Sequence, residues 1–185
     1  IRFEDRDISA LPPYRRVALG IAYTFQITSV FGNLTAFENV ALAVQNAMQR
    51  DHDAFFRLDA HEMDRRCEEA LDRVGLGDRA DTKASTLAYG HQRLLEVAMG
   101  LALSPKLLIL DEPTQGLSDP EIESFCALVR SIAERATILL IEHNMDVVME
   151  LAERITVFNN GTILAEGTPA EIRADDQVQA AYLGS

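Results

Sequence analysis

A strand that ends in two carboxylates constrains this sequence most. Residues 107–113 read Leu-Leu-Ile-Leu-Asp-Glu-Pro. Four bulky apolar residues in succession predict a strand buried on both faces, as in a parallel sheet. Asp111 and Glu112 then lie at the carboxyl end of this strand, where open α/β sheets bind ligands. Successive strand side chains point to opposite faces, so one carboxylate can hold a hydrated Mg²⁺ while the other orients a water. A core strand that ends in a solvated acidic turn is the alternative interpretation.

Four other segments stand in a fixed order around this strand. They are residues 23–26 (YTFQ), 87–93 (LAYGHQR), 114–119 (TQGLSD) and 138–143 (ILLIEH). The ordered set resembles the ATP-binding-cassette (ABC) ATPases, where such segments are the Q-loop, the signature motif, the D-loop and the switch histidine. The strand with its two carboxylates resembles their Walker B motif. Each motif is weak alone, but five in this order are specific, and the resemblance covers nearly the whole chain.

The resemblance implies a role for the residues at the strand ends. Asp111 would bind Mg²⁺ through water, because Mg²⁺ keeps much of its hydration shell. Glu112 would orient and polarise the attacking water as the catalytic carboxylate. His143 would contact the γ-phosphate, and Gln26 would approach both the Mg²⁺ and the attacking water.

The signature and D-loop residues would act across a dimer of ATPase subunits. The signature segment aims a helix N-terminus at the γ-phosphate held by the other subunit, because exposed N–H groups and the helix dipole favour an anion. The residues implied to contact the nucleotide in this way are Ala88, Tyr89, Gly90, His91 and, from the D-loop that also contains Ser118, Asp119. The family usually has serine at the position of Ala88 and glycine at that of Tyr89.

Composition narrows the functional classes. The 185 residues are enough for one domain with a sizeable core, and 48% of them are hydrophobic. A net charge of −12 argues against a nucleic-acid-binding surface, which needs a basic patch. No apolar run reaches the length of a membrane span, so neither a spanning helix nor a signal peptide is expected. Cys67 and Cys126 form no metal-ligand spacing and are expected to be thiols in a reducing cytosol.

The sequence contains no glycine-rich phosphate loop of the form G-x-x-x-x-G-K-[ST]. In the family this loop precedes the Q-loop, so the sequence resembles a cassette without its N-terminal portion. The family fold places the strand that enters the loop between strands 137–141 and 155–158. We therefore expect a broken sheet, a gap filled by another chain, or a segment upstream of this sequence. The strands at 107–110 and 138–141 should still pair in parallel.

The expected fold is an α/β P-loop NTPase (ABC ATPase) core with a mostly parallel sheet and a helical subdomain, truncated at its N-terminus. Residues 1–29 would be the remnant of an N-terminal β-subdomain with the Q-loop strand. Residues 30–104 would form the helical subdomain, and residues 105–185 the Walker B, D-loop and switch-histidine core. Periodicity and capping signals predict helices near residues 38–48, 60–74, 91–103, 120–133, 145–153 and 176–182, and a hairpin around Asn159–Gly161.

Residues 24–26, 33–40 and 91–99 look most like those of ATPase subunits from bacterial branched-chain amino-acid importers. This implies ATP and Mg²⁺ as ligands, a second ATPase subunit and transmembrane permease subunits as partners, and indirectly a periplasmic binding protein. The location implied is the cytoplasmic face of the inner membrane. Alternatives are a urea or amide importer ATPase, a soluble cassette ATPase in DNA repair or translation, which the negative charge disfavours, and an inactive fragment without a phosphate loop.

Overall fold

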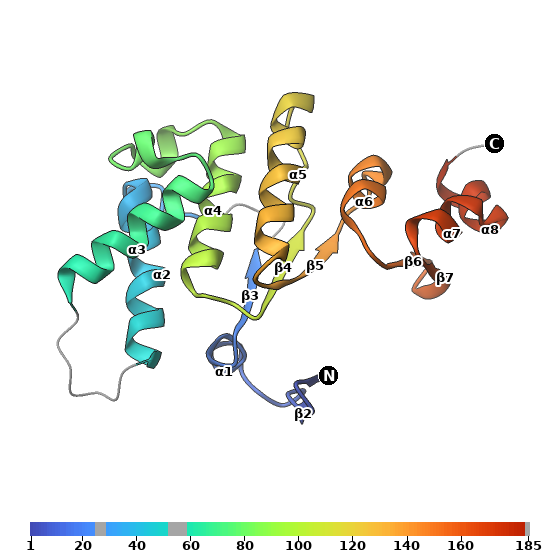
Figure 1. Cartoon of the computed structure of the whole chain (residues 1–185), viewed down its shortest axis with the longest axis horizontal. Coiled ribbons are helices and arrows are strands. Elements are labelled where there is room, and N and C mark those ends of the chain that lie inside the picture. Colours follow the sequence, from blue (N-terminus) through green and yellow to red (C-terminus); the bar gives the residue numbers. More distant parts are fainter. Residues whose placement is uncertain (25–28, 52–58, 184–185) are drawn as a thin grey trace. The chain divides into compact units, whose positions relative to one another are not determined.

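The computed structural model describes residues 1–24, 29–51 and 59–183. Within it the chain divides into two compact units, residues 1–141 and 142–185, which are considered separately (Figure 1). The elements of the first unit are β1 (Arg2–Phe3), β2 (Arg6–Asp7), α1 (Pro13–Ala18), β3 (Ile21–Thr24), α2 (Ala36–Asp51), α3 (Ala60–Arg73), α4 (Tyr89–Ala102), β4 (Leu107–Asp111), α5 (Asp119–Ala133) and β5 (Thr137–Ile141). Short 3₁₀ turns at Gly77–Arg79 and Ala84–Thr86 lead into α4.

The centre of the first unit is a parallel sheet with the strand order β3-β4-β5. Leu108 on β4 lies in register between Ala22 on β3 and Ile138 on β5. The predicted parallel pairing of strands 107–110 and 138–141 is therefore confirmed. In residues 1–10, β1 and β2 form an antiparallel hairpin.

One face of this sheet is covered and the other is largely bare. On the covered face, Leu108 and Leu110 are fully buried, and Gly100 of α4 lies so close that a Cβ there would be 3.2 Å from Leu108 Cδ1. On the opposite face, Tyr23, Leu139 and Ile141 are each more than two-fifths exposed, at 43%, 49% and 45%. Because strand side chains alternate, Asp111 belongs to this second face.

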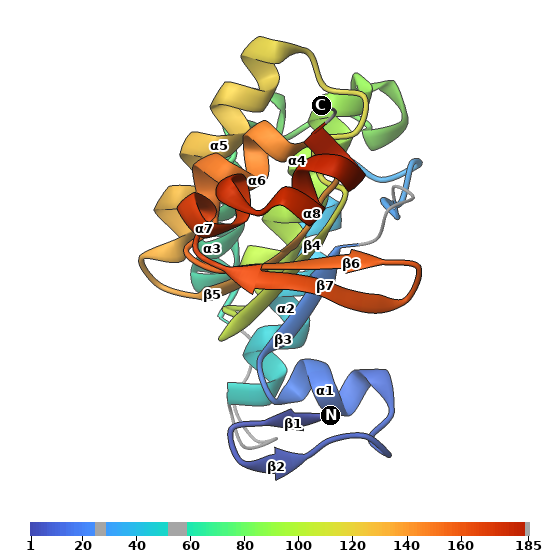
Figure 2. The same ribbon diagram turned by 90° about the vertical axis from the view of Figure 1, so that its right-hand side faces the viewer.

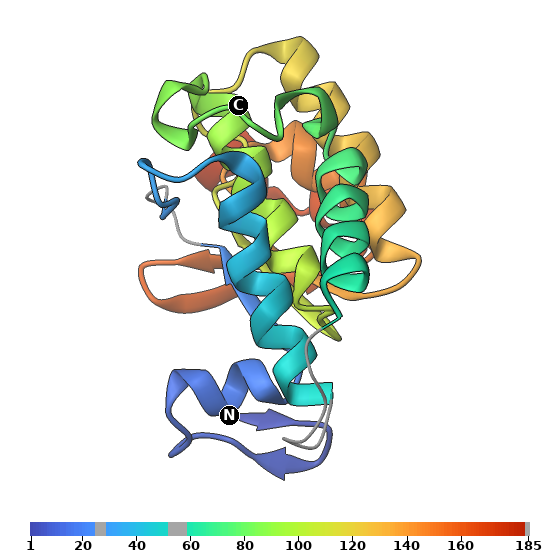
Figure 3. The same cartoon turned by 90° about the vertical axis from the view of Figure 1, so that its left-hand side faces the viewer.

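The helices α2, α3 and α4 pack against one another beside the sheet (Figure 3). Fully buried apolar side chains join them, namely Val40 and Val44 of α2, Leu71 of α3 and Leu95 of α4. The side chain of Asp59 caps α3, and Gly75, at a φ of +72°, follows the end of this helix. In the described part of the chain no helix has both the length and the apolarity to cross a membrane.

The second unit is built around an antiparallel hairpin. Its elements are α6 (Met145–Leu151), β6 (Ile155–Asn159), β7 (Thr162–Gly167), α7 (Pro169–Ala174) and α8 (Asp176–Val178), followed by a π-helical turn at Gln179–Leu183 (Figure 2). Asn160 and Gly161 both have positive φ, which is the turn chemistry that the sequence predicts. Ile155, Val157, Ile172 and Val178 form the core of this unit.

The strands of the two units do not share a sheet among the described residues. β5 is hydrogen-bonded to β4, and β6 is hydrogen-bonded to β7. Direct pairing of strands 137–141 and 155–158, which would contradict the predicted place of a strand between them, is not observed among the described residues. Which of the three expected outcomes applies stays a prediction. The division of the chain into an N-terminal remnant (1–29), a helical subdomain (30–104) and a core with the Walker B motif (105–185) stays a prediction.

Two leucines on the sheet should differ in their contribution to stability. We expect Leu108→Ala to lower the free energy of unfolding by about 2–5 kcal/mol, because it leaves a cavity under α4. Leu139→Ala is the matched control, and a side chain that is half exposed should cost about 1 kcal/mol. Urea unfolding followed by circular dichroism measures both, and equal losses would show that the covered face is not the core of the unit.

Candidate functional site

Asp111 is fixed at the carboxyl end of β4. It lies opposite Ile141 of β5 in the ladder, and the hydroxyl of Tyr23 on β3 donates a hydrogen bond of 2.5 Å to its Oδ2. This bond raises the pKa of the Tyr23 hydroxyl, because ionisation would place a phenolate against the carboxylate. Three neighbouring strands thus determine where this carboxylate stands.

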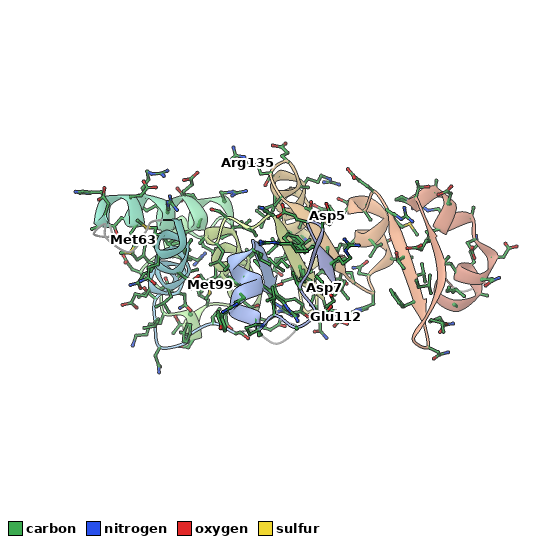
Figure 4. The ribbon with its side chains drawn as sticks, turned by 90° about the horizontal axis from the view of Figure 1, so that it is seen from below. Asp5, Asp7, Met63, Met99, Glu112 and Arg135 are labelled. Atoms are coloured by element: carbon green, nitrogen blue, oxygen red, sulfur yellow. The ribbon has the colours of Figure 1, made fainter. Side chains whose placement is uncertain are left out.

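Glu112, whose side chain is labelled in Figure 4, directly follows β4 and has an unusual backbone conformation. Its φ is +45°, which is uncommon for a residue other than glycine, and such outliers gather at functional sites. The N–H of Glu112 donates to the carbonyl of Ile141 at 2.8 Å. The carbonyl of Glu112 accepts from Nη2 of Arg93 in α4 at 3.4 Å. The turn that carries the predicted catalytic carboxylate is therefore bonded to β5 on one side and to α4 on the other.

Arg93 belongs to a buried ion pair that the sequence interpretation did not single out. Its Nη1 lies 3.2 Å from Oε2 of Glu96, and the side chains are only 4% and 6% exposed. The carboxylate of Glu96 also accepts a hydrogen bond from the N–H of Ser29. Burial raises the pKa of Glu96, against the lowering effect of its bonds to Ser29 and Arg93. The available signal was two opposite charges three residues apart in an otherwise apolar helix.

The signature segment begins α4 as predicted. Ala88 is the N-cap residue, so Tyr89 and Gly90 form the first turn, whose N–H groups suit an anion. An alanine side chain offers no oxygen to those N–H groups. The ring of Tyr89 stacks under the Arg93 guanidinium at 5.6 Å. It also lies against Gly116, where a Cβ would be 3.1 Å from Tyr89 Cε1.

The D-loop residues start α5 beside the signature segment. Glu121 accepts hydrogen bonds from the N–H and the Oγ of Ser118 at 2.8 and 2.7 Å, and Asp119 is the first helical residue. These bonds lower the pKa of the Glu121 carboxyl, and a smaller effect of His91 acts in the same direction. A Cβ on Gly90 would lie 2.6 Å from Oε1 of Glu121. The cap of α5 and the signature glycine are thus packed together.

Two of the predicted site residues are not placed relative to Asp111. Gln26 lies outside the described residues. His143 belongs to the second unit, where its side chain is 67% exposed and the carboxylate of Glu142 accepts from the N–H groups of His143 and Asn144 at 3.0 and 3.2 Å. The roles of Gln26 and His143 stay predictions.

The single carboxylate of Asp111 fits a magnesium site in which water and phosphate oxygens supply the other ligands. No three His, Cys, Asp or Glu side chains in the described ranges are close enough to form a metal cage. Mg²⁺ is commonly held by one or two carboxylates together with water and phosphate oxygens. Asp111, partly exposed at a strand end, could hold Mg²⁺ in this way.

Comparisons with known proteins identify the family. The ABC transporter family matches residues 1–115, and the branched-chain amino acid ATP-binding cassette transporter family matches residues 162–185. The chain belongs to the ATP-binding proteins of ABC transporters. This confirms the family that the five motifs resemble.

Relatives of this ABC protein agree in sequence and in fold. The high-affinity branched-chain amino acid transport ATP-binding protein LivG of Salmonella typhimurium is 38% identical over all of this chain and 75% of its own length. BraF of Pseudomonas aeruginosa is 36% identical over the same shares. The crystal structure of the ADP conformation of MJ1267, an ATP-binding cassette of an ABC transporter, has a TM-score of 0.79 at 25% identity, covering 99% of this chain and 76% of that one. The ABC ATPase fold is thereby confirmed.

The cap at the D-loop of this ABC protein predicts a pH effect. The lowered pKa of Glu121 stabilises the fold above about pH 4.5, and this contribution is lost as the pH falls through the folded-state pKa. Ser118→Ala should therefore raise that pKa toward its usual value. A carboxyl NMR titration measures it, with Ser124→Ala as the control, because Ser124 Oγ donates to the Pro120 carbonyl instead. An unchanged pKa in Ser118→Ala would contradict this assignment.

Proposed function

We propose that this chain is the catalytic and dimerising part of the ATPase subunit of a bacterial branched-chain amino-acid importer. The observation that carries the proposal is the geometry of Asp111 and Glu112. Both stand at the carboxyl edge of a parallel sheet, next to the signature helix. The names of LivG and BraF and the family match at residues 162–185 support branched-chain amino acids as the transported class.

The proposed chemistry is positioning and charge stabilisation. When bound, Mg²⁺–ATP supplies the phosphoryl group that is transferred to water. Asp111 would accept hydrogen bonds from the water ligands of the metal, in the orientation that Tyr23 holds. Glu112 would orient the attacking water and take its proton. Gln26 and His143 would complete the set at the γ-phosphate, where such contacts are worth most in a site that excludes water.

The first partner proposed, a second ATPase subunit, follows from the position of the signature residues. Ala88, Tyr89, Gly90 and His91 open α4 and would contact the nucleotide held by a second ATPase subunit, while Asp119 would act from the D-loop. Transmembrane permease subunits would be further partners, at the cytoplasmic face of the inner membrane. A periplasmic binding protein would select the substrate. Copurification with membrane subunits rather than nucleic acid separates this function from a soluble cassette ATPase.

The 185-residue chain by itself should bind ATP weakly and not hydrolyse it. Its sequence has no G-x-x-x-x-G-K-[ST] loop to supply backbone N–H groups and a lysine to the phosphates. Titration calorimetry measures the binding, and release of inorganic phosphate measures turnover. The matched control is the same chain joined to a segment that contains a phosphate loop. Hydrolysis by the chain alone would contradict this prediction.

In this chain joined to a segment that contains a phosphate loop, called here the subunit that carries a phosphate loop, Glu112→Gln should nearly abolish ATP hydrolysis and leave ATP binding intact. An amide cannot take the proton of water, so kcat should fall by about 100-fold or more while ATP still binds. The ATP-bound dimer should then accumulate and be visible by size-exclusion chromatography. Glu123→Gln, an exposed position on α5, is the control. A variant that hydrolyses ATP at the parent rate would show that Glu112 is not the base.

A further inference from the structure

The buried pair Arg93–Glu96 connects three segments that are distant in the sequence. Arg93 Nη2 reaches the Glu112 carbonyl at 3.4 Å, after the Walker B strand. Glu96 accepts from the N–H of Ser29, where the described chain resumes after the Q-loop segment. The Arg93 guanidinium also covers the ring of Tyr89 in the first turn of the signature helix. One ion pair on α4 thus bonds to the backbone at two residues that are far apart in the sequence, Ser29 and Glu112.

A contribution to the stability of the fold does not by itself explain why a buried ion pair stands at these positions. Removing two charges from water costs free energy that their attraction often does not recover, and apolar replacements of similar volume are frequently neutral or stabilising. At 4% and 6% exposure, the Arg93 and Glu96 side chains bear this cost nearly in full. What an apolar pair could not supply are the two directional bonds, one to a carbonyl and one to an N–H.

The bond to Glu112 is the more consequential of the two. The φ of +45° at Glu112 is sparsely populated, so the surrounding bonds must hold it. Among them, Ile141 of β5 accepts from the N–H at 2.8 Å, and the carbonyl accepts from the N–H of Gln115 at 3.3 Å and from Nη2 of Arg93 at 3.4 Å. Arg93 is the donor that ties this turn to α4. The same guanidinium covers the ring of Tyr89 at 5.6 Å, so Arg93 contacts both the first turn of α4 and the backbone from which the Glu112 side chain projects.

We propose that Arg93 and Glu96 are positioning residues that hold the Glu112 turn and the segment beginning at Ser29 in one arrangement with the signature helix. The pair touches no reacting atom and acts through the backbones of its partners. Its effect on hydrolysis rests on the proposed ATPase function, whereas its effect on the two backbones does not. A purely space-filling role would predict that apolar replacement of both residues leaves the Glu112 and Ser29 backbones unchanged.

Amide hydrogen exchange of the 185-residue chain tests the positioning without nucleotide. In the double variant Arg93→Met, Glu96→Leu, the N–H of Ser29 loses its acceptor and should exchange roughly tenfold faster, as expected for the loss of about one hydrogen bond. The N–H of Glu112 keeps its bond to Ile141, and its exchange should accelerate because the turn opens more readily without the bond from Arg93 to its carbonyl. The control Arg65→Gln, Glu69→Gln removes an exposed pair on α3 and should leave both amides unchanged. Unchanged exchange at Ser29 and Glu112 in the double variant would overturn the proposal.

Single variants keep the test decisive if the double variant does not fold. Glu96→Gln retains an acceptor for the Ser29 N–H, so protection at Ser29 should persist. Arg93→Lys has one ammonium group and should not reach both Glu96 and the Glu112 carbonyl, so exchange should accelerate at Glu112 and not at Ser29. Faster exchange at Ser29 with unchanged exchange at Glu112 in Arg93→Lys would contradict the assigned bonds.

Kinetics of the subunit that carries a phosphate loop test the catalytic consequence. Arg93→Met, Glu96→Leu should lower kcat by roughly 10- to 100-fold, the range for a slightly misplaced reacting group, with KM for ATP unchanged. Arg93→Lys keeps the pair with Glu96 and loses only the bond to the Glu112 carbonyl, so it should lower kcat less than the double variant does. A parent kcat in the double variant, or a loss only in KM, would overturn the positioning role. An inactive parent subunit would instead count against the proposed function, and the exchange result would still decide whether the pair positions both backbones.

Discussion

The parallel hydrogen-bonded ladder β3-β4-β5 is the constraint on which the candidate site depends. Its register places Asp111 opposite Ile141 and brings Tyr23 within hydrogen-bonding distance of the same carboxylate. A slip of one residue would turn Asp111 to the face covered by α4. The apolar packing of Leu108 and Leu110 against that face specifies the register. The burial of two leucines thus determines on which side of the sheet a charged group stands.

Polar groups at the edge of this core are held by partners of complementary chemistry. Burial strengthens the attraction between Arg93 and Glu96, and it also makes each of them costly if its partner is lost. At the surface, the exposed carboxylate of Glu121 caps α5, and Gly90 leaves the space that this carboxylate occupies. The signature helix therefore meets the Walker B turn through a buried charge and the D-loop through an exposed one.

The order of elements and the position of Asp111 and Glu112 were predictable from local signals. Apolar runs indicated β4 and β5, and periodic apolar positions indicated the helices near residues 38–48, 60–74 and 120–133 that the structure confirms. The hydrogen bond between Tyr23 and Asp111 was not predicted, because it joins residues 88 positions apart and depends on strand register. Nor was the bond from Arg93 to Glu112, since no sequence period indicates which helix residue faces a particular strand end.

The bare face of the sheet has an electrostatic consequence for Asp111. Tyr23, Leu139 and Ile141 lie on the same face and are each nearly half exposed, so water has access to the surroundings of the carboxylate. Charge interactions are weak where the dielectric constant is high, and the same groups act more strongly once an apolar cover excludes water. A segment that covers these three side chains would therefore both complete the core and strengthen the interaction of Asp111 with a cation. In this protein the packing of that face therefore determines the dielectric environment in which the carboxylate at the strand end acts.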